Sequence, residues 1–359
     1  MVSWLQFPAV LAAAFVLTAA VVVRAGVRLS LYGDALSERT KIGAGLIGLI
    51  FLAAVTSLPE LAVSVASVVR AGFNAQGLAG ADRVRALSAG ADLATGNMLG
   101  SNVFNLMILV VLDAIRRSEP VLARVNPRHL RSAFSGLILL GLFAAAFAFD
   151  RRNGLAIPLL GTGWLIPLLP LAYVYMVRGY QRREPPRPPE MKAVESRLIG
   201  MPAAAFYGRL LALALVIVLG GAVLSALADR MALPPELGGF GLKQSFIGTL
   251  FLAIATSLPE LVVCAAAVRY GFVDMAVGNV LGSNMFNLLI LFVADIALRG
   301  EALLYYAAGD HWLTALEVLL LTLLLIAAVR RPGRRTFLRL GIYSWLMLVV
   351  YVVFAGMLY

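Results

Sequence analysis

Residues 51–61 read FLAAVTSLPEL and residues 251–261 read FLAIATSLPEL, so the chain contains nearly the same segment twice, 200 positions apart. A second pair of segments follows: residues 96–105 read GNMLGSNVFN and residues 278–287 read GNVLGSNMFN, 182 positions apart. Self-similarity of this kind indicates a fold built from two related halves.

The composition around these segments is that of a membrane protein. Of the 359 residues 61% are apolar, and the mean hydropathy is +0.90, far above the range of a soluble domain. About ten apolar runs are long enough to cross a bilayer as helices, which takes roughly 20 residues each. We expect them at residues 5–27, 42–69, 93–115, 131–149, 155–177, 207–228, 245–269, 275–298, 311–329 and 337–358.

Five spans per half is an odd number, so the two halves must enter the bilayer in opposite directions. The sequence therefore predicts an all-α integral membrane protein with about ten transmembrane helices in two inverted five-helix repeats. We place the first repeat at residues 1–178, a cytoplasmic linker at 179–206 and the second repeat at 207–359. The first half also carries an 18-residue insertion after Gly72, which we expect outside the membrane.

The distribution of charge predicts the orientation. Most of the 30 Lys and Arg residues fall in loops on one predicted side, and basic loops mark the cytoplasmic side of a membrane protein. Both termini should therefore face outside. The net charge of +11 is explained by this bias, so we predict no nucleic-acid partner.

Two glutamates lie deep within apolar spans, where an ionised carboxylate is costly unless it meets a cation, a proton or a cavity. Each follows a proline, which leaves the carbonyl four residues earlier without its helical hydrogen-bond donor. Threonine and serine hydroxyls lie on the same turn. Carboxylate, hydroxyl and carbonyl oxygens together are a ligand set for a hard cation. The side chains concerned are Glu60, Glu260, Thr56, Ser57, Thr256 and Ser257.

The GSNxFN segments supply further polar groups. Ser101 with Asn105, and Ser283 with Asn287, are four residues apart and share one helical face. We expect them to meet the TSLPE turns near the middle of the membrane. Two structural alternatives remain open: the hydroxyls could bond back to their own helices, and the asparagines could join helices. Asn102 and its counterpart in the second copy are rotated away from this face, which favours a structural role for them.

Other polar residues in the spans have less definite roles. Asp113 and Asp295 repeat at the 182-residue offset near helix ends. We interpret them as salt bridges with neighbouring arginines (Arg116, Arg117 and Arg299), with a proton or ion relay as the alternative. Glu317 has no matched partner. The single cysteine, Cys264, excludes a disulfide within the chain, and we expect it to serve packing.

The paired TSLPE and GNxxGSNxFN signatures resemble the alpha repeats of the calcium/cation antiporter superfamily, specifically the prokaryotic sodium/calcium exchangers, over nearly the whole chain. The resemblance implies that Glu60 and Glu260 are the principal calcium ligands, assisted by Thr56 and Thr256. It also implies that the first and sixth helices, near residues 27–34 and 222–229, slide past the rest. The sodium ligands that it implies are Ser57, Ser101, Asn105, Ser257, Ser283 and the backbone at Ala53 and Ala253.

One position departs from that family's pattern. Many sodium/calcium exchangers carry Asp at the last position of the second GSNxFN segment, where this chain has Asn287. The predicted site then holds two carboxylates, which balance one calcium ion or two monovalent ions, whereas a third monovalent ion would add uncompensated charge. This argues against a three-sodium stoichiometry.

The sequence therefore predicts an antiporter in the plasma (inner) membrane that exchanges Ca²⁺ for Na⁺. Exchange for H⁺ is the alternative, a passive cation channel is a weaker one, and other divalent cations stay possible because oxygen sites select by cavity size and rigidity. The predicted partners are the bilayer and the transported ions, with no further cofactor. An enzyme is not expected, since the chain has two histidines and no HExxH segment.

Overall fold

The structure, a computed structural model, describes residues 8–115, 119–157, 161–181, 196–237, 239–240, 255–333 and 335–358. The chain forms two compact units: unit 1 comprises residues 1–59 and 185–279, and unit 2 comprises residues 60–184 and 280–358. Each unit thus takes segments from both halves of the sequence. Helices α3 (Ala53–Asn74) and α11 (Val273–Ala297) continue from one unit into the other, at Pro59–Glu60 and at Asn279–Val280.

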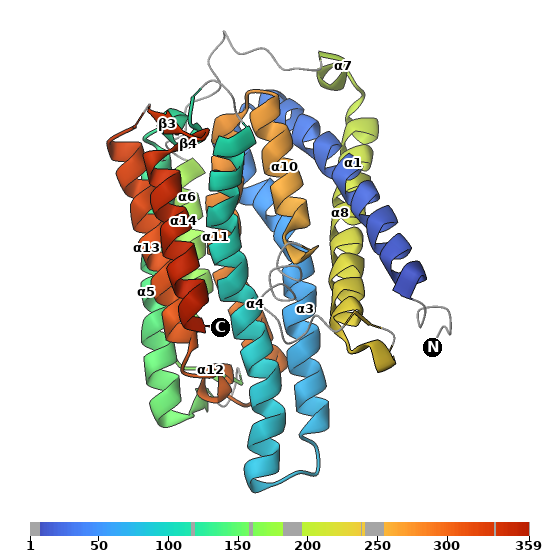
Figure 1. The fold of residues 1–359 in the computed structure, drawn as a ribbon, viewed down its shortest axis with the longest axis vertical. Helices are drawn as coiled ribbons and strands as arrows, with labels where there is room; N and C mark the ends of the chain where they lie inside the picture. The colour runs from blue at the N-terminus through green and yellow to red at the C-terminus, as the bar shows by residue number, and fades with distance from the viewer. Residues whose placement is uncertain are drawn as a thin grey trace. The chain divides into compact units, whose positions relative to one another are not determined.

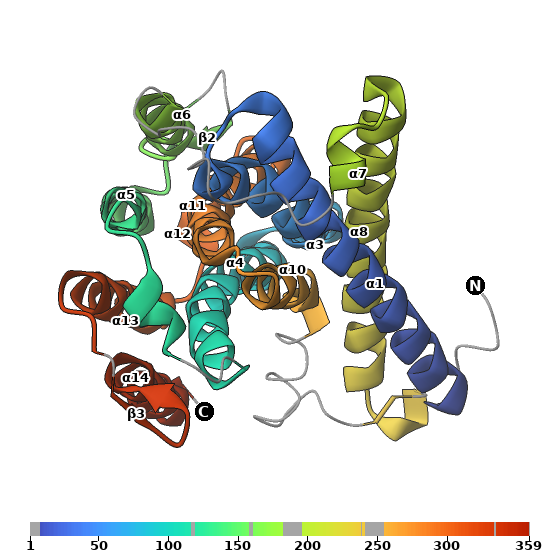
Figure 2. The same ribbon diagram turned by 90° about the horizontal axis from the view of Figure 1, so that it is seen from above.

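Unit 1 is built around α1 (Pro8–Thr40), which packs along α8 (Ala203–Ala232) and α10 (Leu258–Arg269), as Figures 1 and 2 show. Helix α1 extends beyond the predicted end at residue 27, because its second half is covered rather than exposed: Leu29 to Ser37 are all buried. Tyr32 stacks on Phe206 of α8, with ring centroids 5.2 Å apart. The remaining elements are α2 (Ala44–Leu46), the π-helix η2 (Ile47–Leu52), α7 (Ser196–Ile199), η4 (Pro235–Leu237) and the first parts of α3 and α11.

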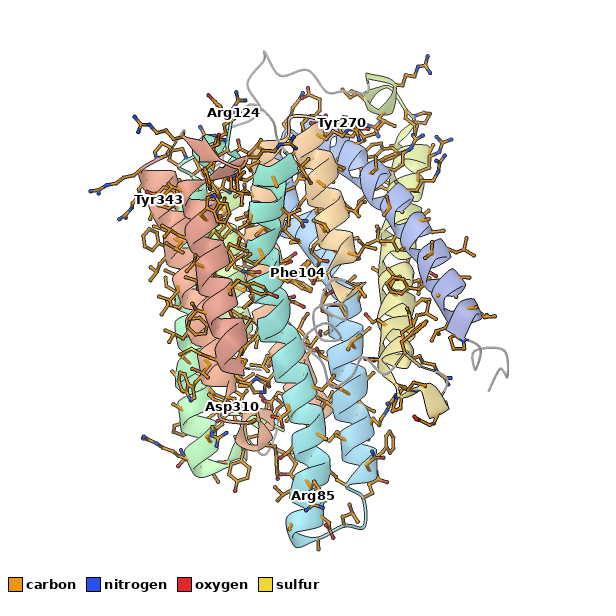
Figure 3. The ribbon with its side chains drawn as sticks, viewed as in Figure 1. Arg85, Phe104, Arg124, Tyr270, Asp310 and Tyr343 are labelled. Carbon is orange, nitrogen blue, oxygen red and sulfur yellow. The ribbon has the colours of Figure 1, made fainter. Side chains whose placement is uncertain are left out.

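Unit 2 is a bundle in which α13 (His311–Arg330) packs on α4 (Gly80–Ile115), α5 (His129–Asn153) and α14 (Ile342–Leu358). Two short antiparallel hairpins close it: β1 (Ala156–Ile157) pairs with β2 (Thr162–Gly163), and β3 (Thr336–Phe337) pairs with β4 (Leu340–Gly341). Arg124 and Tyr343 mark one end of this unit and Asp310 the other (Figure 3). Its other elements are η3 (Val121–Arg124), α6 (Leu168–Gln181), α12 (Leu303–Tyr306) and the remainders of α3 and α11.

The 18-residue insertion belongs to α4. This helix begins at Gly80 and has 36 residues, more than the roughly 20 that a bilayer core requires. Arg85 lies near its free tip (Figure 3). The insertion therefore lengthens a helix, and the turn before it uses positive φ angles at Gly77 and Gly80, a conformation that glycine adopts without strain.

Seven helical segments in the described part of the chain are long and apolar enough to cross a membrane: α1, the run Ala44–Asn74, α4, α5, α8, α11 and α13. Helix α14 is a shorter apolar helix of 17 residues. Helices α6 and α10 have 14 and 12 residues, and residues 245–254 of the predicted seventh span lie outside the described residues. The protein is thus a multi-pass, predominantly helical membrane protein. The count of ten spans and their inverted order stay predictions.

Candidate cation site

The first TSLPE segment lies in a continuous helix. The π-helix η2 leads directly into α3, and Pro59 lies inside α3. Thr56, Ser57 and Glu60 are at most 2% exposed. The Thr56 hydroxyl donates to the carbonyl of Leu52 at 3.0 Å, so the back-bonding alternative applies to this side chain at least in part.

The second TSLPE segment has a different local backbone. Ser257 stands before α10, and Pro259 occupies the first turn of that helix, where its missing N–H costs no hydrogen bond. Glu260 is 1% exposed. Neither Glu260 Oε2 nor Ser257 Oγ has a hydrogen-bond partner among the described residues.

The two segments meet inside unit 1. Ser57 Oγ donates to Glu260 Oε1 at 3.2 Å, across 203 positions of sequence. Gly221 of α8 contacts both prolines, because a Cβ at this position would meet Pro59 and Pro259. A hydroxyl from one copy therefore lies against the carboxylate of the other, with the smallest possible residue of α8 beside both turns.

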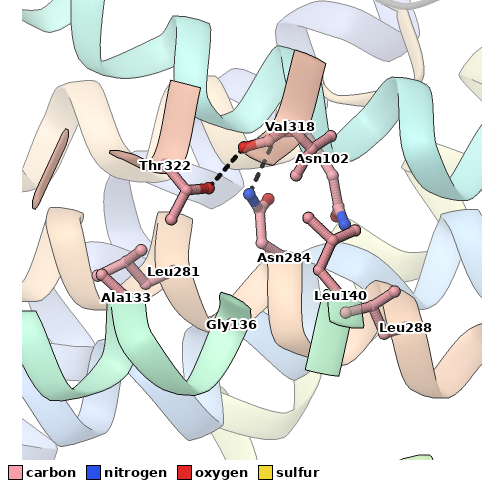
Figure 4. A pocket seen from close by; sticks show the side chains of 9 residues that line it. All are labelled: Asn102, Ala133, Gly136, Leu140, Leu281, Asn284, Leu288, Val318 and Thr322. Atoms are coloured by element: carbon pink, nitrogen blue, oxygen red, sulfur yellow. Dashed lines mark hydrogen bonds between the residues drawn. The ribbon is translucent and has the colours of Figure 1, made fainter. Parts of the chain in front are cut away.

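The GSNxFN segments meet inside unit 2. The Asn287 amide nitrogen donates to Asn102 Oδ1 at 3.0 Å, and the Asn284 amide donates to the Asn102 carbonyl at 3.2 Å, beside a small pocket that Thr322 also lines (Figure 4). This arrangement fixes the Asn287 amide through its nitrogen. Its Oδ1 is left buried and without a hydrogen-bond partner among the described residues.

Other polar side chains of the GSNxFN segments are also buried, and some of their atoms lack a hydrogen-bond partner among the described residues. Ser101, Asn105 and Ser283 are at most 4% exposed, and Ser283 Oγ and both amide atoms of Asn105 have no partner among the described residues. Buried polar atoms are normally hydrogen-bonded. The buried oxygen atoms among them, Ser283 Oγ and Asn105 Oδ1, accept no hydrogen bond from the described residues and are of the kind that can bind a cation.

The first asparagine of each GNxxGSN segment is a functional candidate that sequence reasoning missed. Asn97 donates to the Glu60 carbonyl at 3.2 Å and to Ser64 Oγ at 2.9 Å. Its counterpart Asn279 donates to Cys264 Sγ at 3.2 Å and accepts from Thr56 at 3.4 Å. Each copy thus ties its GNxxGSN helix to a TSLPE helix. The repeat could have revealed these residues, because Asn97 and Asn279 are 182 positions apart and their partners Ser64 and Cys264 are 200 positions apart. These are the same offsets as those of the repeated segments.

Two backbone ligands were also expected. Ala53 is fully buried, and its carbonyl lies 3.4 Å from the Thr56 hydroxyl, which is shared with Leu52. Ala253 lies outside the described residues. In the described part of the chain, no group of three or more His, Cys, Asp and Glu side chains forms a metal centre, so a cation would depend on hydroxyl, amide and carbonyl oxygens beside the carboxylates.

Asp113 and Asp295 both accept hydrogen bonds from loop residues. Asp113 accepts from the backbone N–H groups of Val121, Leu122 and Gly341 and from the Ser344 hydroxyl. Asp295 accepts from Thr162 and from the N–H groups of Gly163 and Leu303. No salt bridge to Asp295 occurs among the described residues, and Arg116 and Arg117 lie outside them. The salt-bridge interpretation is therefore wrong for Asp295, and the Asp113 oxygens are occupied by other donors.

Membrane-length helices that bury carboxylate, hydroxyl and amide oxygens define a multi-pass membrane protein of the cation-transporting type. Residues 10–176 and 206–359 match the family described as "Sodium/calcium exchanger protein". The chain belongs to this family, whose members are antiporters rather than enzymes.

Individual relatives agree with this assignment. The inner membrane protein YrbG of Escherichia coli K12 is 28% identical over 317 residues, which cover 86% of each chain. The sodium/calcium exchanger MaX1 of Methanosarcina acetivorans is 47% identical over 51 residues, 14% of this chain and 15% of that one. A solved structure of the sodium-calcium exchanger NCX_Mj, soaked with 2.5 mM Na⁺ and 0.1 mM Ca²⁺, superposes with a TM-score of 0.66 at 20% identity, covering 98% of this chain and 99% of the other. That likeness shows the fold.

Proposed function

We propose that this protein is a secondary active antiporter that exchanges Ca²⁺ for Na⁺ by alternating access, with Glu60 and Glu260 as its central cation ligands. The observation that carries the proposal is the hydrogen bond from Ser57 to Glu260. It joins the two TSLPE copies at a carboxylate that has no counter-ion among the described side chains. A buried carboxylate in a membrane protein marks an ion path or a proton path.

The remaining ligands are proposed from burial and unoccupied oxygen atoms. Ser257 Oγ, Ser283 Oγ and Asn287 Oδ1 are buried acceptors without donors among the described residues. Hydroxyl and amide oxygens of this kind complete the coordination that Ca²⁺ requires, six to eight oxygens. The full proposed set adds Thr56, Thr256, Ser57, Ser101, Asn105 and the carbonyls of Ala53 and Ala253.

Charge balance limits the stoichiometry. Two carboxylates neutralise one Ca²⁺, two Na⁺ or two H⁺, because Asn287 contributes no charge. A third monovalent ion would bring uncompensated charge into a site of low dielectric. We therefore propose that two monovalent ions exchange for one Ca²⁺, with Na⁺ as the driving ion and H⁺ as the alternative.

The proposed topology follows from the repeat. Ten helices in two inverted halves, a cytoplasmic linker at residues 179–206 and outward-facing termini accord with the basic loops. Alternating access would move α1 and α8, which pack along each other, past the helices that carry the ligands. Gly221 favours such movement, since it presents no side chain where α8 contacts Pro59 and Pro259.

Calcium uptake into proteoliposomes tests the function. Vesicles are loaded with Na⁺, or with acid, so that each ion in turn forms an outward gradient, and the membrane potential is clamped. Uptake driven by the Na⁺ gradient and absent from protein-free vesicles is expected. Uptake with the H⁺ gradient alone would establish the alternative driving ion. Calcium flow that continues without either counter-ion would contradict antiport and indicate a channel.

A further inference from the structure

A second buried acidic centre lies in unit 2, apart from the TSLPE and GSNxFN segments. Asp150, near the end of α5, and Asp295, near the end of α11, are both fully buried. They flank the same residue: the Asp295 carboxylate accepts the Gly163 N–H at 2.7 Å, and a Cβ at Gly163 would overlap the Asp150 carboxylate. Two carboxylates therefore face β2 from two helices.

The two carboxylates differ in their hydrogen bonds. Asp295 receives three donors, from Thr162, Gly163 and Leu303, and such donors stabilise the ionised form. Asp150 receives none: both of its oxygens lack a partner among the described residues. An ionised Asp150 would thus be a buried charge without a donor, next to a second negative charge, which is the most costly arrangement for a carboxylate.

The nearby charged groups do not compensate Asp150. Arg151, its neighbour on α5, donates instead to the Ala307 carbonyl at 2.5 Å. On the other elements at this end of the unit, Arg83 of α4 is bonded to Glu301 at 2.6 Å, and His311 of α13 lies 3.4 Å from Asp92 of α4. Arg151, Arg83 and His311 are therefore each engaged with a partner other than Asp150.

Helix α12, which packs on α5, adds no charge either. Its Tyr306 phenol donates to Glu301 at 2.7 Å, and burial together with that carboxylate raises the pKa of Tyr306 to about 12, so the phenol stays neutral. Tyr305 contributes its ring, which lies against Gly154. The third helix that packs on α5 at this end, α6, begins with the apolar sequence LLPLA.

We propose that Asp150 and Asp295 form a proton-binding site in which Asp150 holds the proton and Asp295 holds the negative charge. A proton fits better than a metal ion, because the Asp295 oxygens are already occupied by donors and the backbone of Gly163 fills the space beside Asp150. Sodium would need several free oxygens in that space. The proton is a bound ligand of the fold, distinct from the ions of the TSLPE carboxylates.

The site is connected to transport through α11. Asp295 ties the end of this helix to β2 and α12, and the same helix carries Ser283 and Asn287. Loss of the proton would place two like charges on either side of Gly163 and loosen the cap. If the protein has the proposed function, alkaline pH should slow calcium exchange because Asp150 loses its proton. The transported ions should stay the same.

The test uses purified full-length protein and two readouts that do not require transport. Infrared spectra of the wild type should contain a carboxylic-acid C=O band that is absent from Asp150→Asn. The thermal midpoint of the wild type should fall by a few degrees between neutral and alkaline pH, whereas the midpoint of Asp150→Asn, which has no titratable group at position 150, should fall less. Asp113→Asn, at the other cap, is the matched control and should retain the band.

Each opposite result has a definite meaning. An unchanged carboxylic-acid band in Asp150→Asn, or the same pH dependence of the midpoint in both proteins, would overturn the proton site. If the band disappears when Na⁺ is added at constant pH, the site binds sodium in place of the proton. Since these readouts need no calcium flux, their failure is distinct from a failure of the antiport proposal. In proteoliposomes, Asp150→Asn should keep calcium exchange at alkaline pH where the wild type loses it.

Discussion

The two TSLPE copies have the same five residues but different local backbones. In the first copy the proline lies inside α3, preceded by a π-helix, whereas in the second it lies in the first turn of α10. Their hydrogen bonds differ too: Ser57 donates to Glu260, while Ser257 Oγ has no partner among the described residues. The same five residues are thus found with two different local backbones.

The C-terminal ends of α4 and α11 show the opposite: their sequences differ, but their hydrogen bonds are alike. Asp113 and Asp295 each accept a backbone N–H eight residues further on, and each also binds a glycine N–H of a β-hairpin. The caps are alike although the surrounding sequences differ. Beside the glycines they diverge: Gly341 contacts Pro120, whereas Gly163 contacts the carboxylate of Asp150. The second cap has therefore gained a titratable group that the first lacks.

The largest effect should come from removing either central carboxylate. Glu60→Gln and Glu260→Gln keep the shape of the side chain but remove one of the two negative charges of the proposed cation site. Each should reduce calcium uptake by roughly 100-fold or more, as a loss of about 3 kcal/mol of ion binding implies. Size-exclusion chromatography would establish that both variants fold. Uptake that is lost in one variant and normal in the other would show that the two copies do not share the ion, and normal uptake in both would disprove the site.

A smaller effect is expected where Asn102 holds Asn287. Asn102→Ala removes the acceptor that orients the Asn287 amide, so Asn287 Oδ1 would no longer be fixed. Loss of an orienting partner costs ligand affinity about 10- to 100-fold, and we expect a rise of this order in the KM for calcium. The maximal rate should change less.

Asn284→Ala is the matched control for Asn102→Ala. Asn284 lines the same pocket and donates to the Asn102 carbonyl, but among the described residues it has no hydrogen bond to Asn287. Its removal should therefore leave the KM for calcium nearly unchanged. Equal changes in the two variants would indicate that the asparagines serve packing between helices, and Asn102 would lose its assigned positioning role.

Sequence reasoning found the buried residues of the site better than their partners. The predicted side chains that the structure describes are all buried, because apolar spans and a repeated Glu already specify burial and function. The partners depend on how neighbouring helices are rotated, which no local pattern shows, so a structural role was favoured for Asn102. Asp150 was missed because Arg151 and Arg152 follow it and make it look like an ordinary helix-end ion pair, yet Arg151 turns to Ala307.

The smallest and most specific effect should come from restoring a third carboxylate. Asn287→Asp would add a negative charge that can balance another monovalent ion. The sodium dependence of calcium exchange should become steeper, and the half-saturating sodium concentration should shift a few-fold. Asn105→Asp adds the same charge in the first copy, where neither amide atom of Asn105 has a hydrogen-bond partner among the described residues. A steeper dependence in both variants would mean that net charge sets the stoichiometry, whereas a change in Asn287→Asp alone would mean that a carboxylate at position 287 is required. If neither variant alters sodium coupling, charge balance does not limit the number of ions exchanged.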